Sequence, residues 1–349
     1  MSDLEISVII PVKNERSTIG PCISALAQQD ISPDRLEVIV VDGGSSDATP
    51  ETARAALAEG KFGRGSVIRS ARGTRPANLN AGLAVATGDI VCRVDARSRL
   101  PASYLQRCAE ILNTRSDVVV VGGRQRAVAA RQTWAALSIA RALNNRWATG
   151  GSPYRWRKTS GASDTVYLGA FRRTDLIAAG GWDEALPVNE DFDLNSRLGR
   201  AGIVWFDPNL TVAYEARSEL GDLLRQYLGF GRSKAAYWWR RGRVPEPRQL
   251  VLLLGTPIAV AGLFIALKAA PLTASVLSIA LATTVDIGGS SCRSATLRVR
   301  AGSVIAMGLM AGGWITGVYV GLAAQVAAPV VCRVPAPRSA DSSMTAPRA

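Results

Sequence analysis

Three aspartates, Asp42, Asp95 and Asp191, are the residues in this sequence whose positions best suit chemistry on a polar substrate. Asp42 and Asp95 each end an apolar, strand-like run, at 37–42 and 90–95. In open α/β sheets, ligands bind in the crevice outside the carboxyl ends of the strands. Asp191 opens a predicted amphipathic helix. We therefore expect a site for a polar, phosphorylated substrate and a proton-transfer step.

Histidine is absent from all 349 residues, which excludes a histidine base, a Ser-His-Asp triad and any histidine metal ligand. A proton transfer near neutral pH would then use a carboxylate as its base. Asp191 is the candidate, with Asp193 as the alternative. A helix start stabilises an anion and lowers its pKa. Burial of Asp191, or repulsion from its acidic neighbours Glu190 and Asp193, must offset this lowering of its pKa. We therefore include Glu190 in the predicted catalytic group.

The composition is strongly basic, with 41 Lys and Arg against 28 Asp and Glu and a net charge of +13. Such a balance favours anionic partners, namely nucleic acid, nucleotide phosphates or an acidic membrane surface. We expect no nucleic-acid partner, because no recognition motif is found and arginines beside apolar segments explain much of the charge. The five cysteines are scattered without a CxxC pair, which argues against a zinc site or a disulfide framework.

Strand-like and helix-like runs alternate through the first part of the chain, which predicts an α/β fold with a mostly parallel, Rossmann-like sheet flanked by helices. Residues 122–165 are polar and arginine-rich, and we expect a helix plus a mobile loop there. The predicted strands are 6–11, 36–42, 66–70, 90–95, 117–121 and 203–206. The predicted helices are 18–28, 46–59, 75–87, 104–113, 189–200 and 220–239.

The C-terminal part changes character after residue 247 and contains three long apolar runs. We predict transmembrane helices at 250–268, 271–288 and 303–328, because about 20 apolar residues span the hydrocarbon of a bilayer. Residues 1–240 would then form a cytosolic domain and 241–332 a membrane region, followed by a disordered tail over 333–349.

Arginines before the first apolar run and between the second and third indicate cytoplasmic loops by the positive-inside rule. The first two runs then form a hairpin, and the third places the tail outside. No signal peptide precedes the first strand, so we expect the N-terminal domain in the cytosol. The predicted location is the plasma membrane, in a multi-pass protein.

Several short motifs follow the predicted strands in a specific order. In that order they resemble the family 2 glycosyltransferases, whose GT-A fold binds nucleotide-diphosphate sugars. Arg93-Val-Asp-Ala-Arg97, the segment 164–171 and the apolar C-terminal part look most like the succinoglycan-type (ExoA-like) exopolysaccharide glucosyltransferases. The motifs that carry the resemblance lie at 9–15, 41–47, 78–82, 88–97, 169–172, 180–184, 189–191 and 225–232.

The resemblance implies a role for each matching residue. Asp42 would accept a hydrogen bond from the base of the nucleotide, and Asp95 would lie near its ribose and diphosphate. Asp191 would be the catalytic base. The diverged glutamine motif on the helix at 220–239 would contact the diphosphate or the acceptor. The remaining predicted ligands are Pro11, Glu15, Asn78 and Arg97 for the nucleotide sugar, and Gln226 and Arg232 for the acceptor or diphosphate.

Arg97 departs from the family pattern, because it replaces the second acid of the Asp-x-Asp motif that usually binds a divalent metal. A guanidinium cannot ligate a cation, but it can pair with phosphate oxygens. Two expectations therefore stay open. Asp95 and other carboxylates hold Mg²⁺ or Mn²⁺, or Arg97 replaces part of the charge of the metal.

Together, the resemblance and the apolar runs imply a membrane-anchored inverting glycosyltransferase. Its donor would be a nucleotide-diphosphate sugar, with UDP as the expected nucleotide, and its acceptor a hydroxyl of a lipid-linked or cell-envelope glycan. One alternative is a polyprenyl-phosphate sugar synthase. Another is a catalytically silent membrane subunit of a glycan-assembly complex. The sequence does not determine the sugar, the linkage or the oligomeric state.

Overall fold

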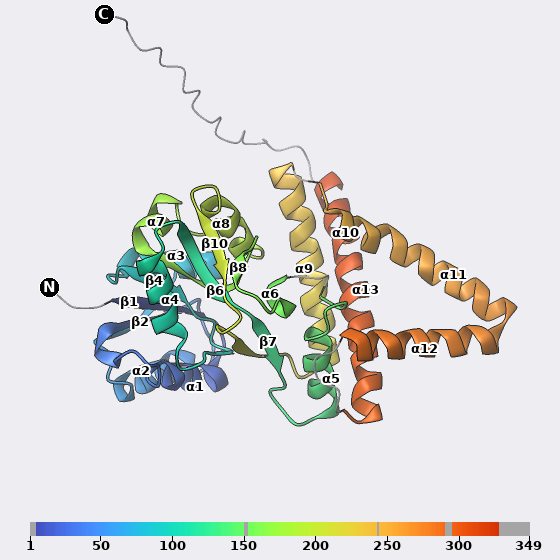
Figure 1. Cartoon of the computed structure of the whole chain (residues 1–349), viewed down its shortest axis with the longest axis horizontal. Coiled ribbons are helices and arrows are strands. Elements are labelled where there is room, and N and C mark those ends of the chain that lie inside the picture. The colour runs from blue at the N-terminus through green and yellow to red at the C-terminus, as the bar shows by residue number, and fades with distance from the viewer. Residues whose placement is uncertain (1–4, 150–152, 243, 290–294, 328–349) are drawn as a thin grey trace, which may run out of the picture.

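The computed structural model of the chain describes residues 5–149, 153–242, 244–289 and 295–327. A sheet domain formed by the first two thirds of the chain adjoins a group of long helices (Figure 1). Beyond these helices, a hairpin of two apolar helices projects away from the sheet. The predicted disordered tail at 333–349 lies outside the described residues.

The main sheet has eight strands in the order β3-β2-β1-β4-β9-β6-β10-β8. Neighbours among the first four are parallel, as are β6 and β10. β9 runs antiparallel between β4 and β6, and β8 is antiparallel to β10. The prediction of a mostly parallel sheet is confirmed. The strands are β1 (Ile6–Val12), β2 (Leu36–Asp42), β3 (Arg64–Arg69), β4 (Ile90–Arg93), β6 (Val118–Gly123), β8 (Gly161–Ala162), β9 (Tyr167–Arg172) and β10 (Ile203–Phe206).

Helices cover both faces of this sheet because its central strands are apolar on both sides. On β1, Val8 and Ile10 pack with α1, α2 and α4, whereas Ile9 packs with α3, α7 and α8. This alternation follows from the two-residue period of a strand. The helices are α1 (Arg16–Leu26), α2 (Thr49–Glu59), α3 (Arg75–Val85), α4 (Tyr104–Thr114), α7 (Arg173–Ala178) and α8 (Glu190–Leu198).

The segment predicted as a helix plus a loop, residues 122–165, has more regular structure than expected. It contains the predicted helix as α5 (Trp134–Leu143), a short α6 (Pro153–Trp156) and two strands. Strands as short as these carry too little periodicity to be recognised in a sequence. One of them joins a second, three-stranded sheet made of β5 (Ser98–Arg99), β11 (Val212–Glu215) and β7 (Gln125–Val128).

Three described helices are long and apolar enough to cross a membrane, in agreement with the predicted number of apolar spans. They are Val251–Ala269, which includes α11 (Thr256–Ala269), then α12 (Pro271–Gly289) and α13 (Leu297–Ala327). The first two are almost wholly exposed. α13 begins six residues before its predicted start at 303, and it packs along α5 and α9 (Leu220–Arg241).

Glycines let α9 and α13 approach each other closely. A Cβ added at Gly317 of α13 would lie 2.3 Å from the carbonyl oxygen of Leu228 on α9. A Cβ added at Gly231 of α9 would lie 2.1 Å from the carbonyl oxygen of Trp314. Backbone contact of this kind forms when small residues line both helices. α13 is therefore part of the packed structure around α9.

We expect Gly317→Val to destabilise the protein, because the new side chain must push α13 away from α9. Overpacking of this kind costs about 1–3 kcal/mol or more. Gly308→Val is the matched control, since it introduces the same residue in the same helix where nothing lies within 4 Å. Thermal unfolding in detergent should show a lower Tm for Gly317→Val than for Gly308→Val. Equal Tm values would contradict the close α9–α13 contact.

Candidate active site

The carboxyl ends of β1, β2 and β4 meet at one edge of the sheet. β1 lies between the other two strands, with Val12 opposite Asp42 and Ile9 opposite Arg93. Pro11 therefore lies near the end of β1, Asp42 ends β2, and Asp95 follows β4 by two residues. The structure thus brings the first two predicted aspartates to the same edge of the sheet, where ligands of α/β sheets bind.

Asp42 is buried, and its carboxylate organises the loop that follows β2. It accepts hydrogen bonds from the backbone N–H of Ser45 at 3.0 Å and of Gly44 at 3.3 Å. Gly44 adopts a φ of +83°, a conformation that glycine reaches without strain. The loop after β1 joins this arrangement, because Ser46 N–H donates to Asn14 Oδ1 at 2.8 Å.

Asn78 lies beside the same loop, from the first turn of α3. Its Nδ2 donates to the carbonyl of Val41 at 3.4 Å. A Cβ added at Gly43 would lie 2.7 Å from that nitrogen, so a larger residue there would displace the Asn78 amide. Asn78 Oδ1 is buried and has no hydrogen-bond partner within the described structure. A buried acceptor without a partner can take a donor from a ligand.

A buried cluster of acids and arginines lies at the end of β4. The guanidinium of Arg93 donates to both oxygens of Asp95, at 2.9 and 3.3 Å, and to Glu190 at 3.1 Å. Arg75 approaches the same Glu190 oxygen at 3.6 Å. Arg93 and Glu190 are each less than a tenth exposed. This bridge connects the third predicted segment, at the start of α8, to the edge that holds Asp95.

The charges of the cluster set the ionisation of its acids. Burial disfavours the charged form of Asp95, but the charges of Arg93 and Arg75 outweigh it and hold the pKa of Asp95 below its usual value. Burial raises the pKa of Glu190, the charge of Arg93 opposes that rise, and the charge of Asp191 adds to it. Asp95 is therefore an anion at neutral pH. The negative charge of Asp191 makes ionisation of Glu190 less favourable.

Asp191 and Asp193 differ in what surrounds them, although they are two residues apart. Asp191 is half-buried, and among the described residues its Oδ1 accepts a hydrogen bond from the N–H of Phe192 alone, at 2.8 Å. Asp193 is buried and pairs with Arg197 at 2.9 Å. Arg197 also donates to the carbonyl oxygens of Ala179 and Gly181, so Asp193 belongs to a structural network. Asp191 is the more available of the two candidate bases.

Arg97 pairs with Glu15, the residue directly before α1. Its Nε lies 2.9 Å from Glu15 Oε1 and 3.1 Å from Oε2, and its side chain is one quarter exposed. Two predicted ligands of the nucleotide sugar are therefore in direct contact. Arg97 also lies close to the edge of the sheet where Asp95 is held.

The site does not fit a divalent cation held by protein side chains alone. Within the residues that the structure describes, no group of three acids or cysteines is placed to hold a metal ion. Both oxygens of Asp95 already accept from Arg93. The position of the second acid is taken by Arg97, whose positive charge repels a cation.

Gln226 and Arg232 lie on α9, and the structure does not join them to the acid–arginine cluster. In the described part of the chain neither side chain has a hydrogen bond or an ion pair, and Arg232 is exposed. α9 does contact α8, however, because the rings of Phe192 and Tyr237 pack edge to face with centroids 6.3 Å apart. The helix with the glutamine motif thus adjoins the helix that carries Asp191.

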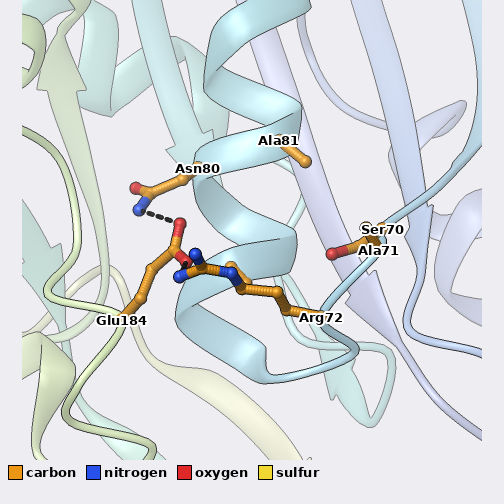
Figure 2. Close-up of a pocket in the computed structure, with 7 residues that line it drawn as sticks. Ser70, Ala71, Arg72, Asn80, Ala81 and Glu184 are labelled. Atoms are coloured by element: carbon orange, nitrogen blue, oxygen red, sulfur yellow. Dashed lines mark hydrogen bonds and ion pairs between the residues drawn. The ribbon is translucent and has the colours of Figure 1, made fainter.

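A hollow of about 500 Å³ is lined by residues other than these. It opens between the end of β3, α3 and the segment before α8, and no predicted site residue lines it (Figure 2). Arg72 and Glu184 cross it as an ion pair of 2.7 Å, with Asn80 bonded to the same carboxylate. Two of its lining residues adjoin the predicted site, because Ser70 N–H donates to the carbonyl of Asp42 and Ala77 directly precedes Asn78.

Arg93 and Arg75 are the residues of the cluster to which the sequence analysis gave no role. A signal for Arg93 was present, because a charged residue interrupts the apolar run of β4. Such a residue must find a buried partner, since an isolated buried charge is very costly. Arg75 gave no comparable signal, because it stands at the first position of α3 and does not interrupt an apolar run.

The family model described as Glycosyl transferase family 2 matches residues 7–174 of the chain. The succinoglycan biosynthesis protein ExoA of Rhizobium meliloti is 31% identical over 260 residues, which cover 73% of this chain and 77% of that protein. The dodecaprenyl-phosphate galacturonate synthase of Rhizobium johnstonii is 28% identical over 126 residues, covering 36% of this chain and 37% of that enzyme.

Among solved structures, the mannosyltransferase PcManGT from Pyrobaculum calidifontis, in complex with GDP-Man and Mn²⁺, has a similar fold. The TM-score is 0.62, and the match covers 91% of this chain and 87% of that chain. Sequence identity is 22%, so this likeness concerns the fold alone. It extends beyond the sheet domain, because a match of this length must include part of the C-terminal helices.

Proposed function

Because the chain belongs to glycosyltransferase family 2, we propose that it transfers a sugar, with inversion, from a nucleotide-diphosphate sugar to a hydroxyl group. The proposed donor is a UDP-sugar, and the proposed acceptor is a lipid-linked or cell-envelope glycan. The observation that carries the proposal is the Arg93 bridge. It joins Asp95, at the ligand-binding edge of the sheet, to the helix start that presents Asp191.

The proposed reaction is a single displacement at the anomeric carbon. The acceptor hydroxyl oxygen forms a bond to that carbon while the bond to the diphosphate oxygen breaks. The nucleoside diphosphate leaves with the electron pair, and Asp191 takes the hydroxyl proton. A positioned carboxylate base contributes about 10²–10⁴-fold to such a step. Attack from the face opposite the leaving group inverts the configuration.

The nucleotide would bind along the loops after β1 and β2. Asp42 holds the loop at 43–45 in place, and Asn78 offers a buried acceptor next to it. Pro11 and Glu15 would line the same region. Asp95 would lie near the ribose and diphosphate. Gln226 and Arg232 keep their proposed role toward the acceptor, since α9 contacts α8 through the Phe192–Tyr237 pair.

Arginine charge would replace part of the charge of a metal in this site. When bound, Mg²⁺ or Mn²⁺ would neutralise the leaving diphosphate, but we derive no step through it because the residues present do not form its site. Arg97 stands at the position of the second acid, and a guanidinium pairs well with phosphate oxygens. It would leave Glu15 for the diphosphate when the donor binds.

We therefore expect donor turnover to persist in EDTA, and we expect Arg97→Asp to make it dependent on added Mn²⁺. The substitution removes the positive charge and places a carboxylate near Glu15 and Asp95. Release of nucleoside diphosphate with and without EDTA measures the effect. Arg99→Asp is the control, because Arg99 is exposed and pairs with Glu215 on the second sheet. Complete inhibition of the unaltered protein by EDTA would show that the metal is essential.

The first alternative is sugar transfer to polyprenyl phosphate. The specific observation in its favour is the partial likeness to the dodecaprenyl-phosphate galacturonate synthase. Thin-layer chromatography of the radiolabelled lipid product separates the two functions. A monophosphate with one sugar would support the synthase, whereas a longer diphosphate-linked glycan would support the glycan acceptor.

The second alternative is a silent membrane subunit, which would bind donor without turning it over. A screen of nucleotide sugars with membranes that contain the chain tests both enzyme proposals at once, with released nucleoside diphosphate as the readout. Turnover above that of membranes without the chain supports an enzyme. Donor binding without release would support the silent subunit.

The proposed location is a membrane, with the catalytic domain on its cytosolic side. Val251–Ala269 and α12 expose nearly all of their apolar side chains, and such a surface is unfavourable in water. The basic residues near the helices agree with this location.

A further inference from the structure

The three apolar helices are not equivalent in their surroundings. Val251–Ala269 and α12 have 6% and 12% of their most apolar windows buried, whereas α13 has 39% buried. Most of the buried residues of α13 recur every three or four positions between Gly302 and Gly321, as expected for one face of a helix. The buried residues are Gly302, Ser303, Ala306, Met310, Gly313, Ile315, Gly317, Val318 and Gly321. One helix is thus packed on protein, and the other two project from it.

The helix that covers α13 is highly charged. Arg225, Arg232, Lys234 and Arg240 follow one another along α9, which runs parallel to α13 and in backbone contact with it. If α13 crossed the hydrocarbon, α9 would have to enter with it. Each charged side chain near the centre of a bilayer costs about 2.5–3.5 kcal/mol on insertion scales. Arg225 pairs with Asp222 of α9 itself, but α13 contains no acidic residue that could pair with the exposed Arg232.

The hairpin is attached to α13 at two separate points. The first apolar helix is held where Tyr319 O–H donates to the carbonyl of Leu253 at 3.0 Å. The second is held by Asp286, whose carboxylate receives Arg141 of α5 at 2.8 Å and Arg300 of α13 at 3.3 Å. Asp286 is 1% exposed, so this ion pair fixes the end of α12 firmly.

These two attachments lie at residues 300 and 319 of α13, which are 19 positions apart. At 1.5 Å per residue, they are separated by about 28 Å along the helix. α11 and α12 leave α13 from these two points and meet far from it, on the side away from the sheet (Figure 1). α13 therefore runs across the base of the hairpin and cannot lie parallel to it as a third span.

Side chains typical of a membrane surface lie around this base. The exposed ring of Trp147 adjoins the end of α12, with the guanidinium of Arg146 4.4 Å from its centroid. Trp134 of α5 is paired in the same way with Arg298 at the start of α13, at 5.4 Å. Tryptophan is enriched at the membrane–water interface, and cytoplasmic segments beside a membrane carry an excess of arginine. The outward face of α13 is apolar, with Ile305, Val320 and Val326 exposed.

We propose that only the hairpin, from Val251 to Gly289, enters the hydrocarbon, and that α13 lies along the bilayer surface with its outward face on the lipid. The hairpin helices have 19 residues each, or about 28 Å, which matches a hydrocarbon core of about 30 Å. α13 carries no charged residue after Arg300. Its inner side is covered by α5 and α9, so its outward side is left to contact lipid. The inference rests on the proposed membrane attachment. It places the chain after α13 on the same side as the catalytic domain.

Two native cysteines test this topology, because Cys292 precedes α13 and Cys332 follows it. The full chain would be prepared as Cys292→Ser and Cys332→Ser, so that each variant keeps one of the two thiols. A membrane-impermeant maleimide would be added to intact cells and to inside-out vesicles. The other cysteines are buried, and burial raises the pKa of Cys22 and of Cys92 to about 12, so they react slowly. The double variant measures that background.

We expect both thiols to be protected in intact cells and labelled in inside-out vesicles. Labelling of Cys332 from outside, with Cys292 protected, would overturn the inference and establish α13 as a span. Labelling of both from outside would support the surface position of α13 and overturn the cytosolic orientation in the proposed function. Release of the chain from membranes by alkaline carbonate would overturn the inserted hairpin, while donor turnover by the released chain would leave the transferase proposal intact.

Discussion

Replacing Asp191 with asparagine is expected to lower kcat by about 10²–10⁴-fold, because the amide cannot accept the proton of the acceptor hydroxyl. The substitution keeps the size of the side chain and the carbonyl oxygen that accepts from Phe192 N–H. Donor affinity should therefore change little. Released nucleoside diphosphate gives kcat, and equilibrium binding of the nucleoside diphosphate gives the affinity.

Asp117→Asn is the matched control for this experiment. Asp117 is exposed, pairs with Arg115 and precedes β6, at the opposite edge of the sheet from the proposed site. Its replacement should leave kcat unchanged. If Asp191→Asn keeps full turnover, Asp191 is not the base. Loss of nucleotide binding together with turnover would instead assign Asp191 to the positioning of the donor.

Arg93→Met is expected to have the largest effect on stability of any single substitution in the site. It leaves Glu190 with only the longer contact to Arg75, and it leaves Asp95 without its two hydrogen bonds. Removing one partner of a buried ion pair typically costs about 3–5 kcal/mol, because the remaining charge stays buried. Donor turnover should be lost with the fold of the site. Thermal unfolding in detergent and a turnover assay measure the two effects.

Arg54→Met provides the comparison for a surface arginine. Arg54 and its partner Glu51 are both more than half exposed, and exposed pairs contribute about 0–1 kcal/mol. Its Tm should therefore stay close to that of the unaltered protein. Arg93→Lys separates charge from geometry, since lysine keeps the charge but cannot bridge two carboxylates in the same plane. A Tm for Arg93→Met equal to that of Arg54→Met would contradict the bridging role.

The ends of the strands were predictable because their chemistry is local. A buried strand needs a continuous apolar run, and Asp42 and Asp95 interrupt such runs where the strands emerge from the core. The carboxyl ends of neighbouring parallel strands then lie at one edge of the sheet, so these two acids could be grouped without coordinates. β9 was not predicted, since its position between β4 and β6 depends on pairing between segments about 50–80 residues apart.

Partners of the charged side chains could not be read from the sequence. The sequence predicts that Arg97 pairs with phosphate oxygens or replaces part of the charge of a metal, and the structure pairs it with Glu15. The link between Arg93 and Glu190 spans 97 positions of the chain. Only the folded chain brings such side chains within hydrogen-bond distance. No periodicity or spacing along the sequence encodes that approach.

By itself, the sequence determined the class of fold, the family, and the presence of three apolar helices long enough to cross a membrane. These properties depend on composition, local periodicity and motif order, all of which can be read from the sequence. Tertiary structure alone decided which arginine joins Asp95 to α8, and that α13 is covered by the charged helix α9. The reason is physical. Hydropathy measures what a helix could bury, whereas its neighbours determine what it does bury.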